Sequence, residues 1–85
     1  MYYVYVLRSL KDNEIYTGYS SNLKSRIDRH NAGLVISTKN RRPLKLVYYQ
    51  AFLSKKDATK EEIYLKSGGK AKNNLKTRIK SSLII

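Results

Sequence analysis

The 85-residue sequence contains no cysteine and no tryptophan, and it has only one histidine, one proline and six acidic residues. Without cysteine the chain has no disulfide framework, no thiolate nucleophile and no sulfur ligands for a zinc ribbon. A single histidine cannot build a multi-histidine metal site. The six carboxylates are scattered along the chain, which argues against a two-metal cluster, since such a cluster needs several converging acids.

Long apolar runs are also missing, because no stretch approaches the roughly 18 apolar residues of a membrane span. The apolar opening ends at Arg8 and lacks both a basic n-region and a small-residue cleavage site, so it is not typical of a signal peptide. We therefore expect a cytoplasmic protein with no membrane partner. A chain of this length builds one core, so we expect a single domain over residues 1–85. We also expect a monomer rather than a dimer.

Positive charge is abundant, with 18 Lys and Arg against 6 Asp and Glu and a net charge of +12. Such an imbalance favours a polyanionic partner, because self-repulsion is otherwise uncompensated. Basic residues cluster in and just after a predicted loop and at the start of the last predicted helix, and we expect phosphate contacts there. The residues concerned are Lys39, Arg41, Arg42, Lys45, Lys70 and Lys72.

Residue patterns predict an α+β domain. β-branched and aromatic residues at 2–8 and 14–19, separated by turn formers, predict a β-hairpin, and 44–52 predicts a third strand. A helix is expected from the Ser20 to Asn22 caps to Gly33, and a second from Ser54 to about Lys66. Residues 34–43 are predicted to form a loop, in which 34–36 could pair briefly with a strand. A last helix runs from Lys70 to Leu83, giving a three-stranded sheet flanked by helices in the order ββαβαα.

Three polar residues lie on helix faces that should be packed. Arg26 and His30 share the flank of Leu23, and Glu62 shares the stripe of Ala58. Structural explanations are a snorkelling Arg26, a buried Glu62–Arg26 salt bridge and a core histidine. The alternatives are a metal or phosphate role for Glu62 and a catalytic role for His30.

Another irregular position is Gly18, inside the second predicted strand. Glycine there indicates a bulge or a close approach by another backbone or a ligand.

These positions resemble the GIY-YIG nuclease family, in particular its small bacterial UPF0213-type members. The tripeptides are Tyr3-Val4-Tyr5 and Tyr16-Thr17-Gly18. The family's arginine falls at Arg26 and its histidine-or-tyrosine position at His30. The A-x-x-x-E-x-x-L-K context of the family's metal-binding glutamate matches Ala58, Glu62, Leu65 and Lys66, and Asn74 is a weaker match to a final asparagine. Tyr19 departs from the pattern, since some relatives have a lysine there.

The resemblance implies a metal-dependent DNA endonuclease, with a substrate that is branched, flapped or partly single-stranded and a link to DNA repair or recombination. It implies five catalytic residues, namely Tyr5, Tyr16, Arg26, His30 and Glu62. One Mg²⁺ or Mn²⁺ ion would bind Glu62, and Lys66 and Asn74 would add nucleic-acid contacts. The general base is Tyr5, Tyr16 or His30. The alternative is a non-catalytic DNA- or RNA-binding module that retains the fold.

Overall fold

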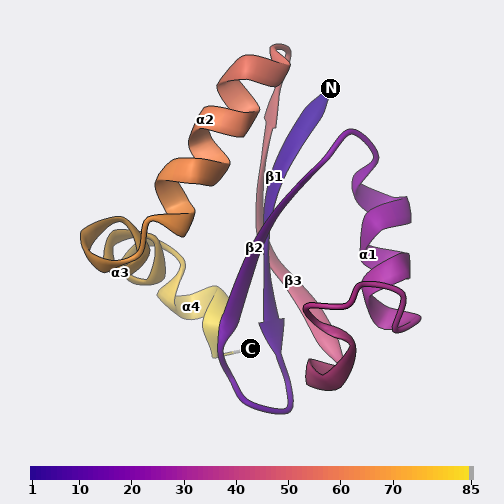
Figure 1. Ribbon diagram of the computed structural model, residues 1–85. Coiled ribbons are helices and arrows are strands. Elements are labelled where there is room, and N and C mark those ends of the chain that lie inside the picture. Colours follow the sequence, from indigo (N-terminus) through magenta and orange to yellow (C-terminus); the bar gives the residue numbers. More distant parts are fainter. Residues whose placement is uncertain (85) are drawn as a thin grey trace.

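A three-stranded antiparallel sheet forms the centre of the computed structural model, which describes residues 1–84. β1 (Tyr2–Ser9) and β2 (Ile15–Ser20) form the predicted hairpin, and β3 (Leu44–Phe52) pairs with the other side of β1. The strand order β2-β1-β3 leaves β2 at an edge (Figure 1). The predicted α+β fold is confirmed, with β1 as the buried middle strand.

Side-chain caps begin two of the helices where the sequence predicts them. α1 (Leu23–Asn31) begins when Asn22 Oδ1 accepts the Ser25 N–H, and α2 (Lys55–Lys66) begins when the Ser54 side chain accepts the Asp57 N–H. Of the three caps proposed for the first helix, Asn22 is therefore the one used. Each cap satisfies a backbone donor that has no partner within the helix.

Two predicted segments differ from the structure. The last helix is not continuous, since α3 (Gly69–Arg78) ends at Ile79 and the short α4 (Lys80–Leu83) follows. This break lets Leu83 pack against the same buried cluster as Ile79. Residues 34–36 form no strand, and the loop contains a 3₁₀ turn, η1 (Lys39–Arg41).

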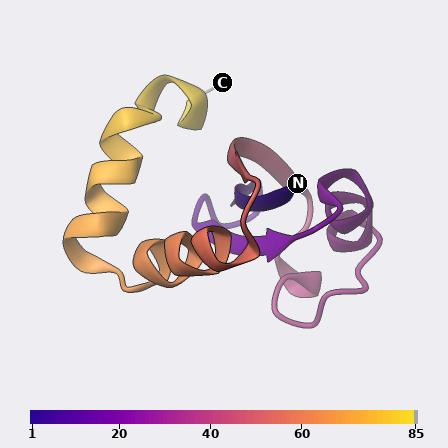
Figure 2. The same cartoon turned by 90° about the horizontal axis from the view of Figure 1, so that it is seen from above.

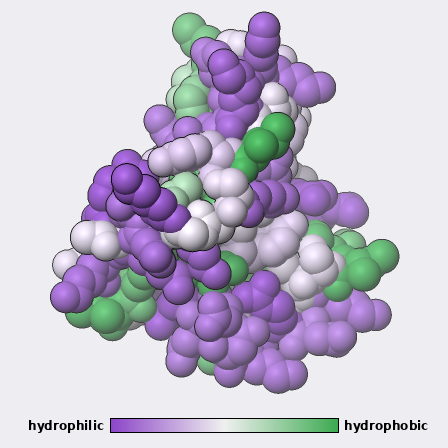
Figure 3. Space-filling view, turned by 60° about the vertical axis from the view of Figure 1, so that its left-hand side comes forward, coloured by the Kyte–Doolittle hydropathy of each residue, from purple (hydrophilic) through white to green (hydrophobic). Residues whose placement is uncertain are grey.

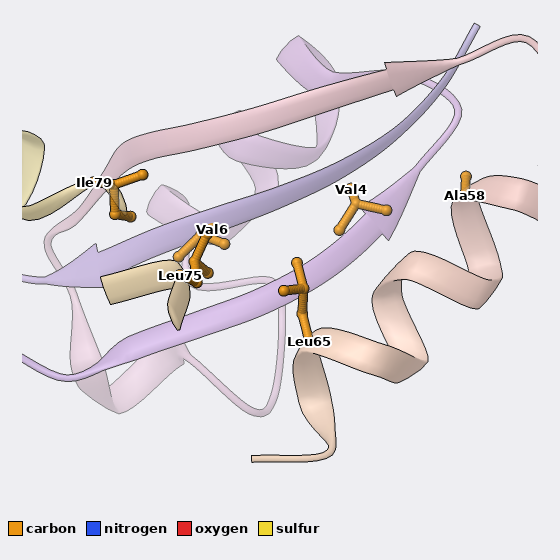
Figure 4. Close-up of a cluster of buried hydrophobic side chains, with 6 residues drawn as sticks. All are labelled: Val4, Val6, Ala58, Leu65, Leu75 and Ile79. Atoms are coloured by element: carbon orange, nitrogen blue, oxygen red, sulfur yellow. The ribbon is translucent and has the colours of Figure 1, made fainter. Parts of the chain in front are cut away.

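Helices cover both faces of the sheet, with α1 on one side and α2, α3 and α4 on the other (Figures 1 and 2). Alternation along β1 supplies both faces, because successive strand residues point in opposite directions. Val4 and Val6 pack against α2 and α3, as Figure 4 shows, whereas Tyr5 and Leu7 face α1. The first cluster comprises Val4, Val6, Ala58, Leu65, Leu75 and Ile79.

Polar and charged groups dominate the face of the molecule that carries α2 (Figure 3). Figure 3, in which the α2 side is turned forward, shows mostly hydrophilic residues and small separate apolar areas. Within residues 1–84, none of the helices has the length and apolar character to cross a bilayer.

Candidate active site

Gly18 makes room for a buried tyrosine. Gly18 lies opposite Tyr5 in the β1–β2 pairing, and a Cβ atom at Gly18 would collide with the Tyr5 ring and hydroxyl. The close approach that the sequence indicates is therefore made by a side chain. The β-bulge in the sheet lies elsewhere, between Val6 and Leu7 where β1 pairs with β3. Glycine in the second tripeptide thus lets the Tyr5 ring lie across β2 on the α1 face.

Tyr5 lies at one end of a buried chain of hydrogen bonds. Its hydroxyl is 2.8 Å from His30 Nε2, and His30 Nδ1 is 2.7 Å from Thr38 Oγ1. All three side chains belong to fully buried residues. Arg26, one turn before His30 on α1, donates its Nε–H to the Tyr5 oxygen at 3.4 Å. Of the predicted catalytic residues, the structure thus joins Tyr5, Arg26 and His30 by direct hydrogen bonds.

Burial keeps the side chains of His30 and Tyr5 neutral. Desolvation, helped by the nearby Arg26 charge, lowers the pKa of His30 from 6.5 to about 4. Desolvation also raises the pKa of Tyr5, and this effect exceeds the opposing influence of the Arg26 hydrogen bond and charge. Proton transfer from Tyr5 to His30 would create two charges where each ring already disfavours its charged form.

Tyr16 is more accessible. It is half-buried on the edge strand β2, and its ring packs edge-on against His30 with centroids 5.2 Å apart. Its hydroxyl accepts a long 3.4 Å hydrogen bond from the exposed Ser37. Tyr16 also lines a hollow of about 260 Å³, together with Lys66 and Lys72. The Tyr16 ring therefore contacts the buried His30 on one side and borders an open hollow on the other.

Glu62 and Lys66 approach Tyr16 from α2. Because β2 is the edge strand, side chains of α2 can pass this edge to reach Tyr16. Lys66 Nζ is 3.0 Å from Glu62 Oε2 and 5.8 Å from the centre of the Tyr16 ring. Within residues 1–84, no ion pair joins Glu62 to Arg26, so the salt bridge considered from the sequence is wrong and Lys66 is the partner of Glu62. The Glu62 charge nevertheless makes a small contribution to the raised pKa of Tyr5.

The donor atoms fit one weakly held divalent ion. Within residues 1–84, no three His, Asp or Glu side chains gather into a metal-binding cluster. Glu62 offers a carboxylate near Tyr16, and its side chain is 21% exposed. Mg²⁺ commonly binds through one or two carboxylates and keeps several of its waters, so a single glutamate suits it. A site of this kind is completed by water and by the phosphate oxygens of a substrate.

Arg26 offers free N–H donors beside Tyr5. Apart from the Nε–H given to Tyr5, its guanidinium makes no hydrogen bond within residues 1–84. The remaining donors form a planar fork suited to phosphate oxygens. Arg26 is thus half-buried, held by one hydrogen bond and open on its outer side.

The other predicted phosphate contacts differ in availability. Arg41 pairs with Asp12 at 2.9 Å, which lowers the pKa of that carboxyl through a hydrogen bond. Arg42 donates to the Lys39 carbonyl and packs against Gly33, while Lys39 and Lys45 are exposed.

Lys70 is exposed at the start of α3, and Gly68 and Lys72 on either side of it in the sequence line the hollow beside Tyr16. Asn74 lines a different hollow, with Glu61 and Arg78, and shares none of the lining residues of the Tyr16 hollow. Lys66 and Lys72 are therefore the predicted phosphate contacts that line the hollow beside Tyr16.

Two residues at the site are absent from the sequence-based prediction. Thr38 and Ser37 come from the segment predicted as a loop, yet they bond His30 and Tyr16 respectively. A threonine in a polar loop has no distinguishing pattern, so no signal in a single sequence identifies Thr38. Its role follows only from the way η1 returns the chain to the end of α1.

Comparison with known proteins gives a consistent family. Residues 1–76 match a family model described as the GIY-YIG catalytic domain. A UPF0213 protein of Clostridium perfringens is 42% identical over 83 residues, 96% of this chain and 85% of the relative. A UPF0213 protein of Staphylococcus haemolyticus is 46% identical over 67 residues, 78% of this chain and 80% of the relative.

A solved structure agrees with these sequence matches. The solution NMR structure of a UPF0213 protein from Bacillus halodurans is 35% identical, with a TM-score of 0.57 over 94% of this chain and 86% of that one. The resemblance identified from the two tripeptides and the spaced Arg26, His30 and Glu62 is confirmed at the level of the family. This chain belongs to the GIY-YIG family.

Proposed function

We propose that this protein is a metal-dependent endonuclease that hydrolyses phosphodiester bonds in DNA. The observation that supports it best is a connected set of polar side chains at the site. Arg26 bonds Tyr5, which bonds His30, and the His30 ring packs against the half-buried Tyr16. Glu62 joins this set through Lys66, whose Nζ lies near the Tyr16 ring. The family's catalytic-domain description points to the same class of reaction. Net charge of +12 suits a polyanionic substrate.

Tyr16 is the best candidate for the general base. Tyr5 and His30 are fully buried and hydrogen-bond to each other, so neither offers a free atom to a water molecule. Among residues 1–84, the Tyr16 hydroxyl has only the long hydrogen bond from Ser37, and Tyr16 borders the hollow. A base must lie within hydrogen-bond reach of the proton that it removes, which favours the accessible tyrosine.

Glu62 would hold the divalent ion, Mg²⁺ or Mn²⁺. When bound, the ion would stabilise the negative charge that develops on the leaving oxygen. Arg26 would neutralise charge on the other phosphoryl oxygens with its free N–H groups. Lys66, which shares the Glu62 carboxylate in this structure, would then be available to bind a phosphate.

The substrate backbone would follow the lysines that lead away from Tyr16. Lys66 and Lys72 line the hollow beside it, and Lys70 lies exposed between them. We therefore expect Lys66, Lys70 and Lys72 to contact phosphates near the cleaved bond. Lys39 in η1 and Lys45 at the start of β3 would contact more distant phosphates. A role in DNA repair or recombination would require preference for flapped or branched DNA.

Cleavage of a panel of DNA substrates tests this proposal. Flapped, branched, single-stranded and plain duplex DNA are incubated with Mg²⁺ or Mn²⁺, and 5′-phosphate and 3′-hydroxyl ends are mapped. Glu62→Gln should abolish cleavage, whereas its neighbour Glu61→Gln, with the same charge change on the same helix, should retain it. Cleavage that survives in Glu62→Gln would indicate a contaminating nuclease and refute the assignment.

A second candidate is a DNA- or RNA-binding module without catalysis. The ion pair between Lys66 and Glu62 favours it, because it already satisfies the carboxylate that catalysis requires for the metal. This module would bind nucleic acid with a steep dependence on salt concentration and cleave none of the panel. The same panel separates the two functions, because the nuclease loses its cleavage in Glu62→Gln, whereas the module binds DNA without cleaving it both unmodified and as Glu62→Gln.

A further inference from the structure

We propose that Thr38 is a positioning residue that holds His30 in its neutral Nδ1–H tautomer and so fixes both tyrosines of the site. The inference rests on the proposed function only for its catalytic consequence. Its evidence is that both nitrogens of the fully buried His30 ring have a hydrogen-bond partner, with Nε2 2.8 Å from the Tyr5 hydroxyl and Nδ1 2.7 Å from Thr38 Oγ1.

The tautomer follows from the groups around the Tyr5 oxygen. Arg26 Nε is a donor with no accepting capacity, so the Tyr5 oxygen accepts from it. Tyr5 then has its own hydroxyl hydrogen to donate, and His30 Nε2 is its acceptor at 2.8 Å. With Nε2 accepting, a neutral ring has its hydrogen on Nδ1, which donates to Thr38 Oγ1.

The Arg26 charge favours the same arrangement. In a neutral imidazole the lone-pair nitrogen is the negative end and the N–H is the positive end. Arg26 bonds Tyr5, on the Nε2 side of the ring, whereas Thr38 lies on the Nδ1 side. A lone pair on Nε2 therefore faces the cation, and the N–H points away from it.

Backbone hydrogen bonds keep Thr38 in place. The Thr38 and Lys39 N–H groups both donate to the Val35 carbonyl, and the Arg41 N–H donates to the Thr38 carbonyl. Val35 is itself buried, so this turn is anchored in the core. Thr38 thus presents its hydroxyl from a fixed backbone to the last turn of α1.

His30 passes this constraint on to Tyr16. The imidazole packs edge-on against the rings of Tyr5 and Tyr16, with centroids 5.6 Å and 5.2 Å away. A ring held at both nitrogens cannot rotate, so it offers Tyr16 a fixed surface. Loss of the Thr38 hydroxyl would leave a buried Nδ1–H without an acceptor, and the ring would move its hydrogen to Nε2 to avoid this cost.

The tautomer can be observed directly because His30 is the only histidine. Long-range ¹H–¹⁵N NMR spectra of the full chain at pH 7 report the two nitrogen shifts. We expect a protonated, pyrrole-type Nδ1 and an unprotonated, pyridine-type Nε2. The opposite pattern, or an average of the two, would overturn the proposal whether or not the protein cleaves DNA.

Two variants extend the test. Thr38→Val keeps the shape and removes the hydroxyl, so His30 should change to the Nε2–H tautomer, and any DNA cleavage should fall at least 10-fold in kcat with little change in KM. Thr38→Ser keeps the hydroxyl and should restore both properties. If Thr38→Val fails to fold, the Thr38→Ser and unmodified spectra still decide the tautomer. Unchanged His30 shifts in a folded Thr38→Val protein would refute the role of Thr38.

Discussion

Acid should destabilise this protein well above the pH at which carboxylates titrate, because of His30. The pKa of His30 is about 4 in the folded chain and near 6.5 when it is exposed. Between these values the unfolded chain binds about one proton more than the folded chain, so stability is lost as the pH falls. Each pH unit in this window lowers the free energy of unfolding by about 1.4 kcal/mol, or roughly 3 kcal/mol over the whole window.

NMR and denaturation measure the two sides of this linkage. The Cε1–H signal of the single histidine should titrate near pH 4 in the folded protein and near 6.5 in urea-unfolded protein. Urea denaturation from pH 7 to pH 4.5 should give the matching loss of stability. Asp12, whose pKa the Arg41 hydrogen bond lowers, titrates below this window and so contributes little. A His30 signal that titrates near 6.5 in the folded state would refute the reasoning.

Four substitutions and one control variant test other contacts. Gly18→Ala would drive a methyl group into the Tyr5 ring and should lower the free energy of unfolding by about 1–3 kcal/mol in urea denaturation. Leu75→Ala, at a position 1% exposed in the larger core cluster, should cost about 2–5 kcal/mol, and a loss below 1 kcal/mol would contradict the packing described. Tyr5→Phe removes a buried hydrogen-bonding group and should cost about 1–3 kcal/mol, whereas Tyr48→Phe, whose hydroxyl bonds only the exposed Gln50, should cost less. Lys72→Gln should reduce the steepness of log affinity for duplex DNA against log salt concentration by about 0.9. An unchanged slope would mean that Lys72 does not contact a DNA phosphate.

Much of the fold could be predicted from local sequence. The β-branched and aromatic runs mark all three strands to within about a residue, and Asn22 and Ser54 mark the starts of α1 and α2. The break at Ile79 could not be predicted, because the apolar row continues through it. The apolar residues keep the same helical spacing on both sides of Ile79, so the sequence predicts one continuous helix. Only packing against the sheet decides where that helix is interrupted.

Part of the candidate site could also be predicted from local sequence patterns. Arg26, His30 and Glu62 stand out because each puts a polar group on a face that periodicity assigns to the core. Their partners do not stand out. The sequence suggested Arg26 as the partner of Glu62, but a lysine one turn along α2 is closer, and local helix geometry makes that pairing available without any tertiary contact.

The sequence by itself determined the charge, the strands, most of the helices and the family, because these depend on composition, on short-range periodicity and on the order of a few spaced residues. Tertiary structure alone decided that Tyr5 is buried against Gly18, that Thr38 bonds His30 across eight residues, and that Lys66 reaches Tyr16 around the edge of β2. These contacts join segments that no local rule connects. They exist because an edge strand, a helix end and a returning loop meet at one point.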